Sequence, residues 1–162
     1  MTKIIILDTS ALLYLPLSKG KGERHITTYS VIKEIYKDEI KKAVIDAYIQ
    51  TNILKVVKPK KKYIVEALRK AREIGEHRLS KADVEVLALA IQLRGEGAIV
   101  FTDDYAIQNI LHINNIPYLP VRRQIKRKLK WTYQCEACGE TYNSETEICE
   151  KCGSKVVRIG KY

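Results

Sequence analysis

Short β-branched runs alternate with helical stretches along the first 120 residues of the chain. Apolar runs of strand length, bounded by polar or turn residues, predict strands over residues 3–7, 54–57, 98–101 and 116–119. Apolar residues at helical spacing predict helices over residues 10–15 and 39–50, and further helices that begin at Ser30, after Pro59, at Ser80 and at Thr102. The segment over residues 18–23 contains glycine and lysine and predicts a loop.

The order of these elements predicts the fold class. Strands that alternate with helices favour an α/β domain, with a parallel sheet that helices cover on both faces. We expect this domain to span residues 1–120, because the last predicted strand ends there and a basic segment follows. A basic linker over residues 121–133 and a small module over residues 134–162 complete the predicted organisation.

The charge of the chain indicates the kind of partner it binds. The 162 residues include 29 Lys and Arg against 19 Asp and Glu, which gives a net charge of +10. Such an excess favours a polyanion, of which nucleic acid is the commonest. No apolar run approaches the roughly 18 residues of a membrane span, and the apolar run at the N-terminus is too short for a signal sequence. We therefore expect a cytoplasmic protein with no membrane partner.

The C-terminal module contains all the cysteines of the chain, in two C-x-x-C-G units. These residues are Cys135, Cys138, Cys149 and Cys152. Each C-x-x-C turn presents two thiolates to one ion, and two such turns complete a closed tetrahedral site for one structural Zn²⁺, as in a zinc ribbon. A module of about thirty residues is too small to fold by apolar burial alone, so the metal would stabilise it. Disulfides or a redox dithiol are the alternatives, which two symmetric pairs and the absence of a signal peptide disfavour.

Five carboxylates are predicted to converge at one edge of the sheet. In open α/β sheets, ligands bind beyond the carboxyl ends of the strands. The acids that follow a strand, or lie in the first turn of a helix starting at that edge, are Asp8, Glu34, Asp83, Asp103 and Asp104. A carboxylate cluster without cysteine or histidine suits Mg²⁺ or Mn²⁺ rather than zinc. Such a site activates water and neutralises charge on a phosphodiester.

Each of these acids also has a purely structural interpretation. Asp83 is the second half of a capping box, Glu34 is an exposed first-turn acid, and Asp103 is a helix N-cap. Asp8 is harder to explain in this way, because a carboxylate after four apolar strand residues lies near the buried end of the sheet. A buried acid needs a cation or several hydrogen-bond donors. The joint placement of the acids therefore favours the metal site.

The residues around these acids resemble a known family. The motifs that resemble those of the PIN-domain ribonucleases are Asp8-Thr9-Ser10, Glu34, Asp83 within S-K-A-D-V-E-V-L-A-L-A, and Thr102-Asp103-Asp104. This resemblance covers about residues 1–120. The order of a PIN-like domain, a basic linker and a four-cysteine ribbon resembles, more narrowly, the archaeal endonucleases that mature small-subunit rRNA.

The resemblance implies a metal-dependent endoribonuclease that cleaves single-stranded precursor small-subunit rRNA at its 3′ end, within the pre-ribosomal small subunit. By family analogy, the catalytic acids are Asp8, Glu34, Asp83 and Asp103, with Asp104 as an extra or substitute acid. The catalytic Mg²⁺ or Mn²⁺ would be bound by Asp8, Asp83 and Asp103. Two hydroxyl groups, those of Ser10 and Thr102, would orient carboxylates or water.

The linker and the residues that follow it are predicted to bind RNA. The candidate residues are Arg122, Arg123, Lys126, Arg127, Lys128, Lys130 and Trp131. The cations would contact phosphates with little reading of sequence, and Trp131 would stack on an unpaired base. A solvated linker surface, and packing of Trp131 between the ribbon and the main domain, are the plainer alternatives.

Two other functions stay open from the sequence alone. One is an RNA-binding ribosome assembly factor without cleavage activity, which the presence of the acids disfavours. The other is a PIN-type toxin that cleaves tRNA or mRNA, and such toxins usually consist of the PIN domain alone. The appended ribbon argues against the toxin. We expect a monomer.

Overall fold

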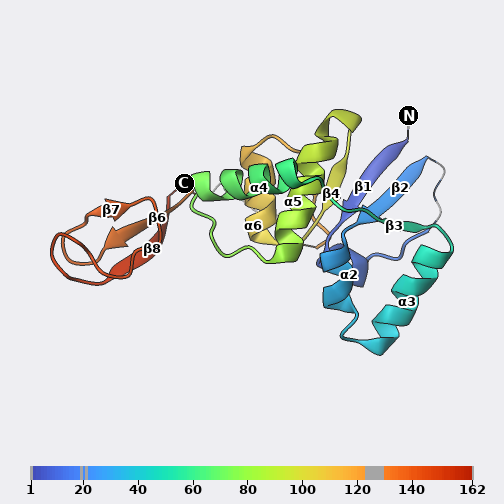
Figure 1. Ribbon diagram of the computed structural model, residues 1–162, viewed down its shortest axis with the longest axis horizontal. Coiled ribbons are helices and arrows are strands. Elements are labelled where there is room, and N and C mark those ends of the chain that lie inside the picture. Colours follow the sequence, from blue (N-terminus) through green and yellow to red (C-terminus); the bar gives the residue numbers. More distant parts are fainter. Residues whose placement is uncertain (1, 19, 21, 123–129, 162) are drawn as a thin grey trace.

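The computed structural model describes residues 2–18, 20, 22–122 and 130–161 and confirms the α/β fold class. Five parallel strands form one sheet in the order β3-β2-β1-β4-β5 (Figure 1). Their bounds are β1 Lys3–Leu7, β2 Glu23–Thr27, β3 Leu54–Val56, β4 Ile99–Phe101 and β5 Tyr118–Leu119. Successive residues of a strand point to opposite faces, and residues 4–7 of β1 are all at most 4 % exposed. Both faces of the sheet are therefore covered.

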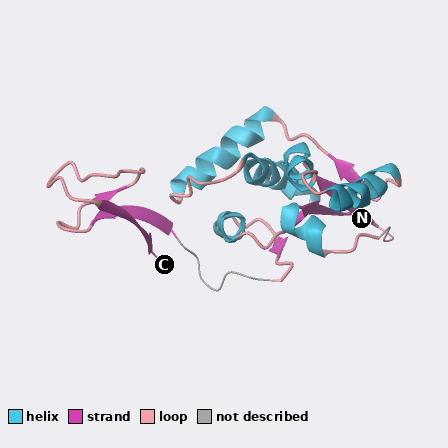
Figure 2. Cartoon of the chain, turned by 90° about the horizontal axis from the view of Figure 1, so that it is seen from below, coloured by secondary structure: helices cyan, strands magenta, loops and turns pink. Residues whose placement is uncertain are grey.

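Helices connect the strands and cover the sheet (Figures 1 and 2). Their bounds are α1 Thr9–Tyr14, α2 Tyr29–Ile35, α3 Glu39–Gln50, α4 Lys61–Glu73, α5 Lys81–Leu93 and α6 Tyr105–Ile113, with a short 3-10 helix at Arg94–Glu96. Eight of the thirteen residues of α5 are buried, because this helix contacts α2, α4 and α6 as well as β1 and β4. In the part of the chain that the structure describes, no helix is long and apolar enough to cross a membrane.

Most element boundaries agree with the sequence, and two differences lie in the segment from β2 to α2. Strand β2 was not predicted, because its first residues, Glu23 and Arg24, are exposed and follow the glycine-containing loop. Only Ile26 and Thr27 at its end are buried. The N-cap predicted at Ser30 is wrong: the side chain of Thr28 accepts the hydrogen bond that begins α2, and Ser30 lies inside the helix.

The C-terminal module is a three-stranded antiparallel ribbon with a very small core. It contains β6 Lys130–Cys135, β7 Thr141–Tyr142 and β8 Val156–Lys161, in the order β7-β6-β8. Its buried residues are Tyr133, Cys135, Cys149 and Val156. Because β6 begins at Lys130, the last four residues of the predicted linker belong to this ribbon. Two of the four core residues are cysteines, so apolar burial alone holds this module together weakly.

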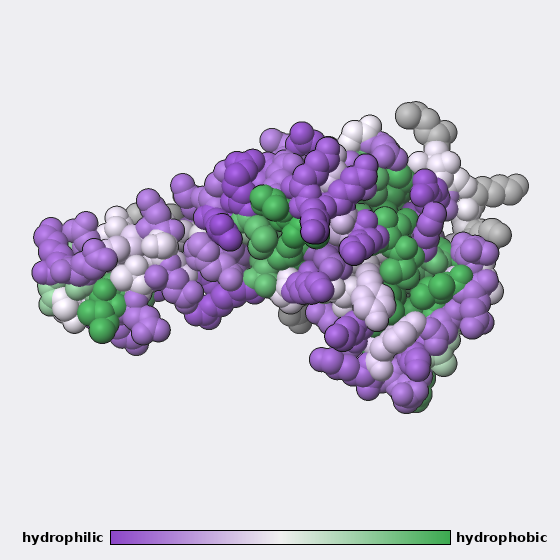
Figure 3. All heavy atoms as spheres, viewed as in Figure 1, coloured by the Kyte–Doolittle hydropathy of each residue, from purple (hydrophilic) through white to green (hydrophobic). Residues whose placement is uncertain are grey.

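The ribbon packs against the loop that follows α4. The backbone N–H of Trp131 donates to the carbonyl of Ile74 at 2.9 Å. The guanidinium of Arg158 donates to the carbonyl of Gly75 at 3.2 Å and to the carboxylate of Glu76 at 3.0 Å, and it lies 4.3 Å from the centre of the Trp131 ring. Figure 1 shows the ribbon at one end of the molecule, beside the end of α4. Hydrophilic side chains predominate on the viewed surface of both units (Figure 3).

Gly75 is the closest point of this contact. Its φ is 73°, and a Cβ added there would lie 2.2 Å from the Trp131 carbonyl oxygen. We expect Gly75→Ala to displace the ribbon and to lower the free energy of unfolding by more than the roughly 1–2 kcal/mol of left-handed strain. The matched control is Gly97→Ala, since Gly97 has φ 72° and no neighbouring atom within 4 Å. Urea unfolding followed by the fluorescence of Trp131, the single tryptophan, measures both; equal effects would contradict the role of the contact.

Candidate active site and cysteine cluster

A pocket opens at the carboxyl edge of the sheet, where β1 and β4 end side by side. The strand order reverses at β1, which has β2 on one side and β4 on the other, and ligands bind at such a crevice. Leu7 pairs in register with Phe101, so Asp8 and Thr102 follow at neighbouring positions. The pocket has a volume of about 360 Å³. All five carboxylates singled out from the sequence line it: Asp8, Glu34, Asp83, Asp103 and Asp104.

Asp8 is the buried centre of this pocket. Asp8 is only 5 % exposed to solvent. One carboxylate oxygen accepts from the Ser10 hydroxyl at 2.7 Å and from the Ala11 N–H at 2.8 Å, and the other accepts from the Thr102 hydroxyl. Burial raises the pKa of Asp8 in spite of these donors, and the charge of Asp104 raises it further. A nearby cation would therefore relieve an unfavourable buried charge.

The hydroxyls of Ser10 and Thr102 tie the ends of β1 and β4 together. The Ser10 hydroxyl accepts from the Asp103 N–H at 2.9 Å, and the Thr102 hydroxyl accepts from the Asp104 N–H at 3.0 Å. Because a backbone N–H only donates, each hydroxyl proton is directed to the carboxylate of Asp8. The two hydroxyls thus hold the Asp8 carboxylate in one orientation.

Loss of the Thr102 hydroxyl removes one hydrogen bond from the Asp8 carboxylate and one from the Asp104 N–H. We expect Thr102→Val to lower the free energy of unfolding by about 2–4 kcal/mol, because Asp8 loses a donor and the Asp104 N–H loses its acceptor at a fully buried position. Thr102→Ser is the control, since it keeps the hydroxyl and removes only a methyl group. Urea unfolding at neutral pH compares them, and a valine variant as stable as the serine variant would contradict the expectation.

Asp83 combines a structural role with a place in the pocket. One of its carboxylate oxygens accepts from the Ser80 N–H at 2.7 Å, and its own N–H donates to the Ser80 hydroxyl at 3.2 Å, which completes the predicted capping box. Burial raises the pKa of Asp83, and the charges of Asp104 and Glu34 add to the effect. Glu34 accepts from the Thr9 hydroxyl at 2.6 Å. Both acids thus face the same concentration of negative charge.

Asp103 and Asp104 differ in their surroundings. The side chain of Asp103 is 8 % exposed, and it accepts from the backbone N–H of Arg122 at 2.6 Å and from its Nε at 3.0 Å. The same guanidinium lies 3.7 Å from the centre of the Tyr14 ring. Asp104 is exposed and caps α6 by accepting from the Ile107 N–H, so the N-cap is Asp104 and not Asp103. An ion that binds Asp103 would compete with Arg122.

The four cysteines are the one group among the described residues in which three or more metal-ligating side chains lie close enough together to hold an ion. The carboxylates of the pocket do not form such a compact group.

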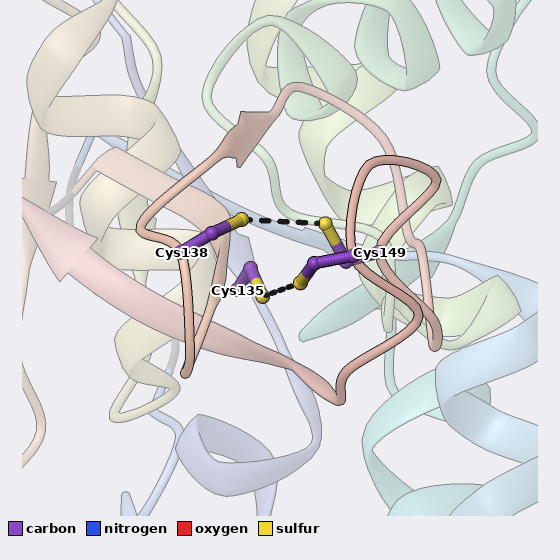
Figure 4. Close-up of side chains that lie close together, drawn as sticks. Cys135, Cys138 and Cys149 are labelled. Carbon is purple, nitrogen blue, oxygen red and sulfur yellow. Dashed lines mark hydrogen bonds between the residues drawn. The ribbon is translucent and has the colours of Figure 1, made fainter.

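The cysteine cluster has the geometry of a tetrahedral metal site. The four Sγ atoms all lie within 4.8 Å of one another, and the cysteines are free thiols. The Sγ atoms of Cys135 and Cys152 are 3.4 Å apart, and those of Cys138 and Cys149 are 3.6 Å apart (Figure 4). Four sulfurs at about 2.3 Å from a central ion are about 3.8 Å from one another. The Tyr142 hydroxyl donates to Cys149 and lowers the pKa of that thiol to about 6, which favours the thiolate.

The residues predicted to bind RNA differ in where they lie. Arg123, Lys126, Arg127 and Lys128 lie outside the described residues. Arg122 lies at the acidic pocket, while Lys130 is exposed at the start of β6. Trp131 packs beneath Arg158 at the contact between the ribbon and the α/β domain. These surroundings agree with the alternative in which Trp131 packs between the ribbon and the main domain.

Tyr14 lines the acidic pocket but was not singled out from the sequence. The residue is 53 % exposed, two positions after the buried Leu12 of α1. An aromatic residue in the predicted helix that follows Asp8 is the one signal that the sequence holds for it.

Comparison with known proteins agrees with this geometry. Residues 5–93 match the family described as the PIN domain of ribonuclease. Endoribonuclease Nob1 of Pyrococcus abyssi is 35 % identical over 158 residues, which are 96 % of this chain and 92 % of that protein. Endoribonuclease Nob1 of Methanocaldococcus jannaschii is 34 % identical over 165 residues, 96 % of this chain and 77 % of that protein. Ribonuclease VapC1 of Thermoplasma acidophilum is 31 % identical over 157 residues, 96 % of this chain and 77 % of that protein.

These similarities extend from the acidic pocket into the ribbon. The family match contains Asp8, Glu34 and Asp83, and the full-length relatives align with nearly the whole chain, which includes the cysteines. The chain therefore belongs to the family of PIN-domain ribonucleases that includes the archaeal Nob1 endoribonucleases.

Proposed function

We propose that this metal-dependent endoribonuclease cleaves single-stranded precursor small-subunit rRNA at its 3′ end, within the pre-ribosomal small subunit in the cytoplasm. The observation that carries the proposal is the pocket in which four further carboxylates surround the buried Asp8 at the carboxyl edge of the sheet. Full-length similarity to Nob1 endoribonucleases, ribbon included, supports the choice of substrate. The net charge of +10 suits an RNA partner.

In this proposal Asp8, Asp83 and Asp103 bind Mg²⁺ or Mn²⁺, and Glu34 and Asp104 add negative charge around the ion. Their donor chemistry fits, because hard oxygen ligands without sulfur or nitrogen suit these ions. Such an ion supplies an activated water and neutralises charge on the phosphate. The protein contributes a fixed orientation: the Ser10 and Thr102 hydroxyls hold the Asp8 carboxylate. The expected products carry a 5′-phosphate and a 3′-hydroxyl.

We also propose that the four cysteines bind one structural Zn²⁺. Four sulfurs close together with no further ligand among the described residues fit a closed tetrahedral site. Lys130 and Trp131 lie on the ribbon and the predicted RNA-binding residues of the linker precede it, so the zinc would hold part of the RNA-binding surface in place. A monomer stays our prediction.

A cleavage assay tests the proposed activity. The substrate is a short RNA that spans the 3′ end of precursor small-subunit rRNA, incubated with and without added Mn²⁺ or Mg²⁺. We expect a single cut that requires the added ion. Omission of the ion is preferable to a chelator, because a chelator would also remove zinc from the ribbon. Cleavage that is equally fast without added ion would contradict the proposal.

The similarity to a ribonuclease named VapC1 supports one competing candidate, a nuclease that acts on tRNA or mRNA. The same assay with tRNA and with an unrelated mRNA fragment distinguishes the two. Preferred cleavage of the rRNA junction supports the maturation enzyme, whereas preferred cleavage of tRNA or mRNA supports the competing candidate. Tight binding of the rRNA fragment without any cleavage would instead favour an assembly factor.

A further inference from the structure

A groove beside the acidic pocket carries aromatic and basic side chains that the sequence did not single out. Tyr29 and Lys33 come from α2, Lys37 from the turn after it, and Lys81 from the first turn of α5. The groove shares Glu34 and Ala82 with the acidic pocket, so the two hollows are continuous. Figure 1 shows the start of α5 beside α2, and these two helices form the groove.

Tyr29 presents a large aromatic surface to solvent. It is 68 % exposed although it begins a helix whose next residues are buried. Among the described residues, no cation or second ring stacks on it. The ring of Tyr14 differs, because the Arg122 guanidinium lies 3.7 Å from its centre. Tyr29 therefore has an accessible ring face that an unpaired base can stack on.

The three lysines of the groove carry charge without a partner acid. Lys33, Lys37 and Lys81 are all exposed, and within the described ranges none of them forms an ion pair. Lys33 lies four residues after Tyr29, so the two side chains share one face of α2. The groove thus combines positive charge with an aromatic surface, next to a pocket of carboxylates. A strand of RNA complements the first two features, and a metal-bound phosphate complements the third.

We propose that this groove is a nucleotide subsite for the RNA substrate, in which one unpaired base stacks on Tyr29 and adjacent phosphates contact Lys33, Lys37 and Lys81. The proposal rests on the endoribonuclease function, and it adds the part of the surface that holds the strand beside the scissile bond. Stacking requires a single-stranded nucleotide, and lysine contacts read no base sequence. The subsite therefore selects unpaired RNA and positions its backbone over the carboxylates.

Binding of a fluorescein-labelled single-stranded RNA, measured by anisotropy, tests the subsite. The measurements use the zinc-loaded full chain with Asp8→Asn as the common background, so that the RNA stays intact without a chelator. We expect Tyr29→Ala to weaken binding about tenfold, and Tyr29→Phe to bind like the background protein because it keeps the ring. Binding of Tyr29→Ala that equals that of Tyr29→Phe would overturn the stacking role.

The salt dependence of the same binding tests the lysines. Each phosphate contact contributes about 0.7 to the slope of log K against log salt for single strands, so Lys33→Gln with Lys81→Gln should lower the slope by about 1.4. The matched control is Lys3→Gln with Arg94→Gln, which removes the same charge at the opposite edge of the sheet. Equal slopes for the two double variants would overturn the phosphate contacts.

A crosslink locates the base without replacing any residue of the groove. RNA with a single 5-iodouridine, irradiated with the Asp8→Asn protein, should crosslink to the peptide that contains Tyr29, and mass spectrometry identifies that peptide. A crosslink confined to other peptides at every position of the label would overturn the proposal. Because these assays measure binding, they separate the two hypotheses: cleavage by the wild type tests the nuclease, whereas the groove variants test the subsite.

Discussion

Asp8→Asn is expected to lower the rate of RNA cleavage by at least roughly two to three orders of magnitude while RNA binding persists. Asparagine keeps the shape of the side chain but removes its charge, and a neutral amide is a weak ligand for Mg²⁺ or Mn²⁺. Loss of a preorganised electrostatic group in an active site has an effect of this size. The substitution leaves the proposed RNA-binding residues of the groove and the ribbon unchanged. Single-turnover cleavage and anisotropy measure the two properties separately.

The matched control for this variant is Glu96→Gln. Glu96 is an exposed acid in the 3-10 helix before β4, at the opposite edge of the sheet, so its replacement removes one negative charge far from the pocket. We expect it to cleave like the wild type. Cleavage by Asp8→Asn at a rate close to that of Glu96→Gln would contradict the place of Asp8 in the catalytic site.

The same variant is also expected to change how stability depends on pH. The pKa of Asp8 in the folded protein is raised above its ordinary value of 3.8, mainly by burial. A group with a raised pKa contributes stability that is fully present below pH 3.8 and is lost as the pH rises through the folded pKa. Above that pH the wild type holds an unfavourable buried charge that asparagine lacks, so we expect Asp8→Asn to gain stability relative to the wild type as the pH rises, without added Mg²⁺ or Mn²⁺. The difference in unfolding free energy between the two proteins at each pH measures this.

The sequence predicts a site better than it predicts what surrounds it. Asp8 is recognisable because an acid directly after four apolar strand residues needs an explanation, and the two C-x-x-C-G units place four candidate metal ligands within one short segment. Both signals are local. The buried hydroxyl of Thr102 also follows, since the residue comes directly after a predicted strand.

What the sequence does not predict depends on contacts between distant segments. Arg122 reads as part of a basic linker, yet in the fold it pairs with Asp103, and nothing in its neighbours indicates this. Lys33 and Lys81 are isolated lysines in two separate helices, and only the packing of α2 against α5 brings them to one groove. Strand β2 was missed for a related reason: its first residues are polar, and only its pairing with β1 and β3 makes it a strand.

Loss of the metal from the ribbon is expected to unfold this module and to leave the α/β domain folded. The core of the α/β domain contains no residue of the ribbon, so it does not depend on the ribbon for its packing. The ribbon itself buries four residues, of which two are cysteines, and structural zinc sites contribute roughly 10–16 kcal/mol in small peptides. We therefore expect Cys149→Ser to abolish stoichiometric zinc and to eliminate the structure of the ribbon.

The fluorescence of Trp131 reports this loss directly, because it is the single tryptophan and it packs beneath Arg158 at the contact between the two units. In Cys149→Ser its emission should shift to longer wavelength, while far-UV circular dichroism keeps the helical signal of the α/β domain. Ser144→Ala is the control, since Ser144 lies in the same loop and is not a cysteine ligand. A Cys149→Ser protein that keeps one zinc per chain and an unchanged Trp131 spectrum would show that the ribbon does not depend on a four-cysteine metal site.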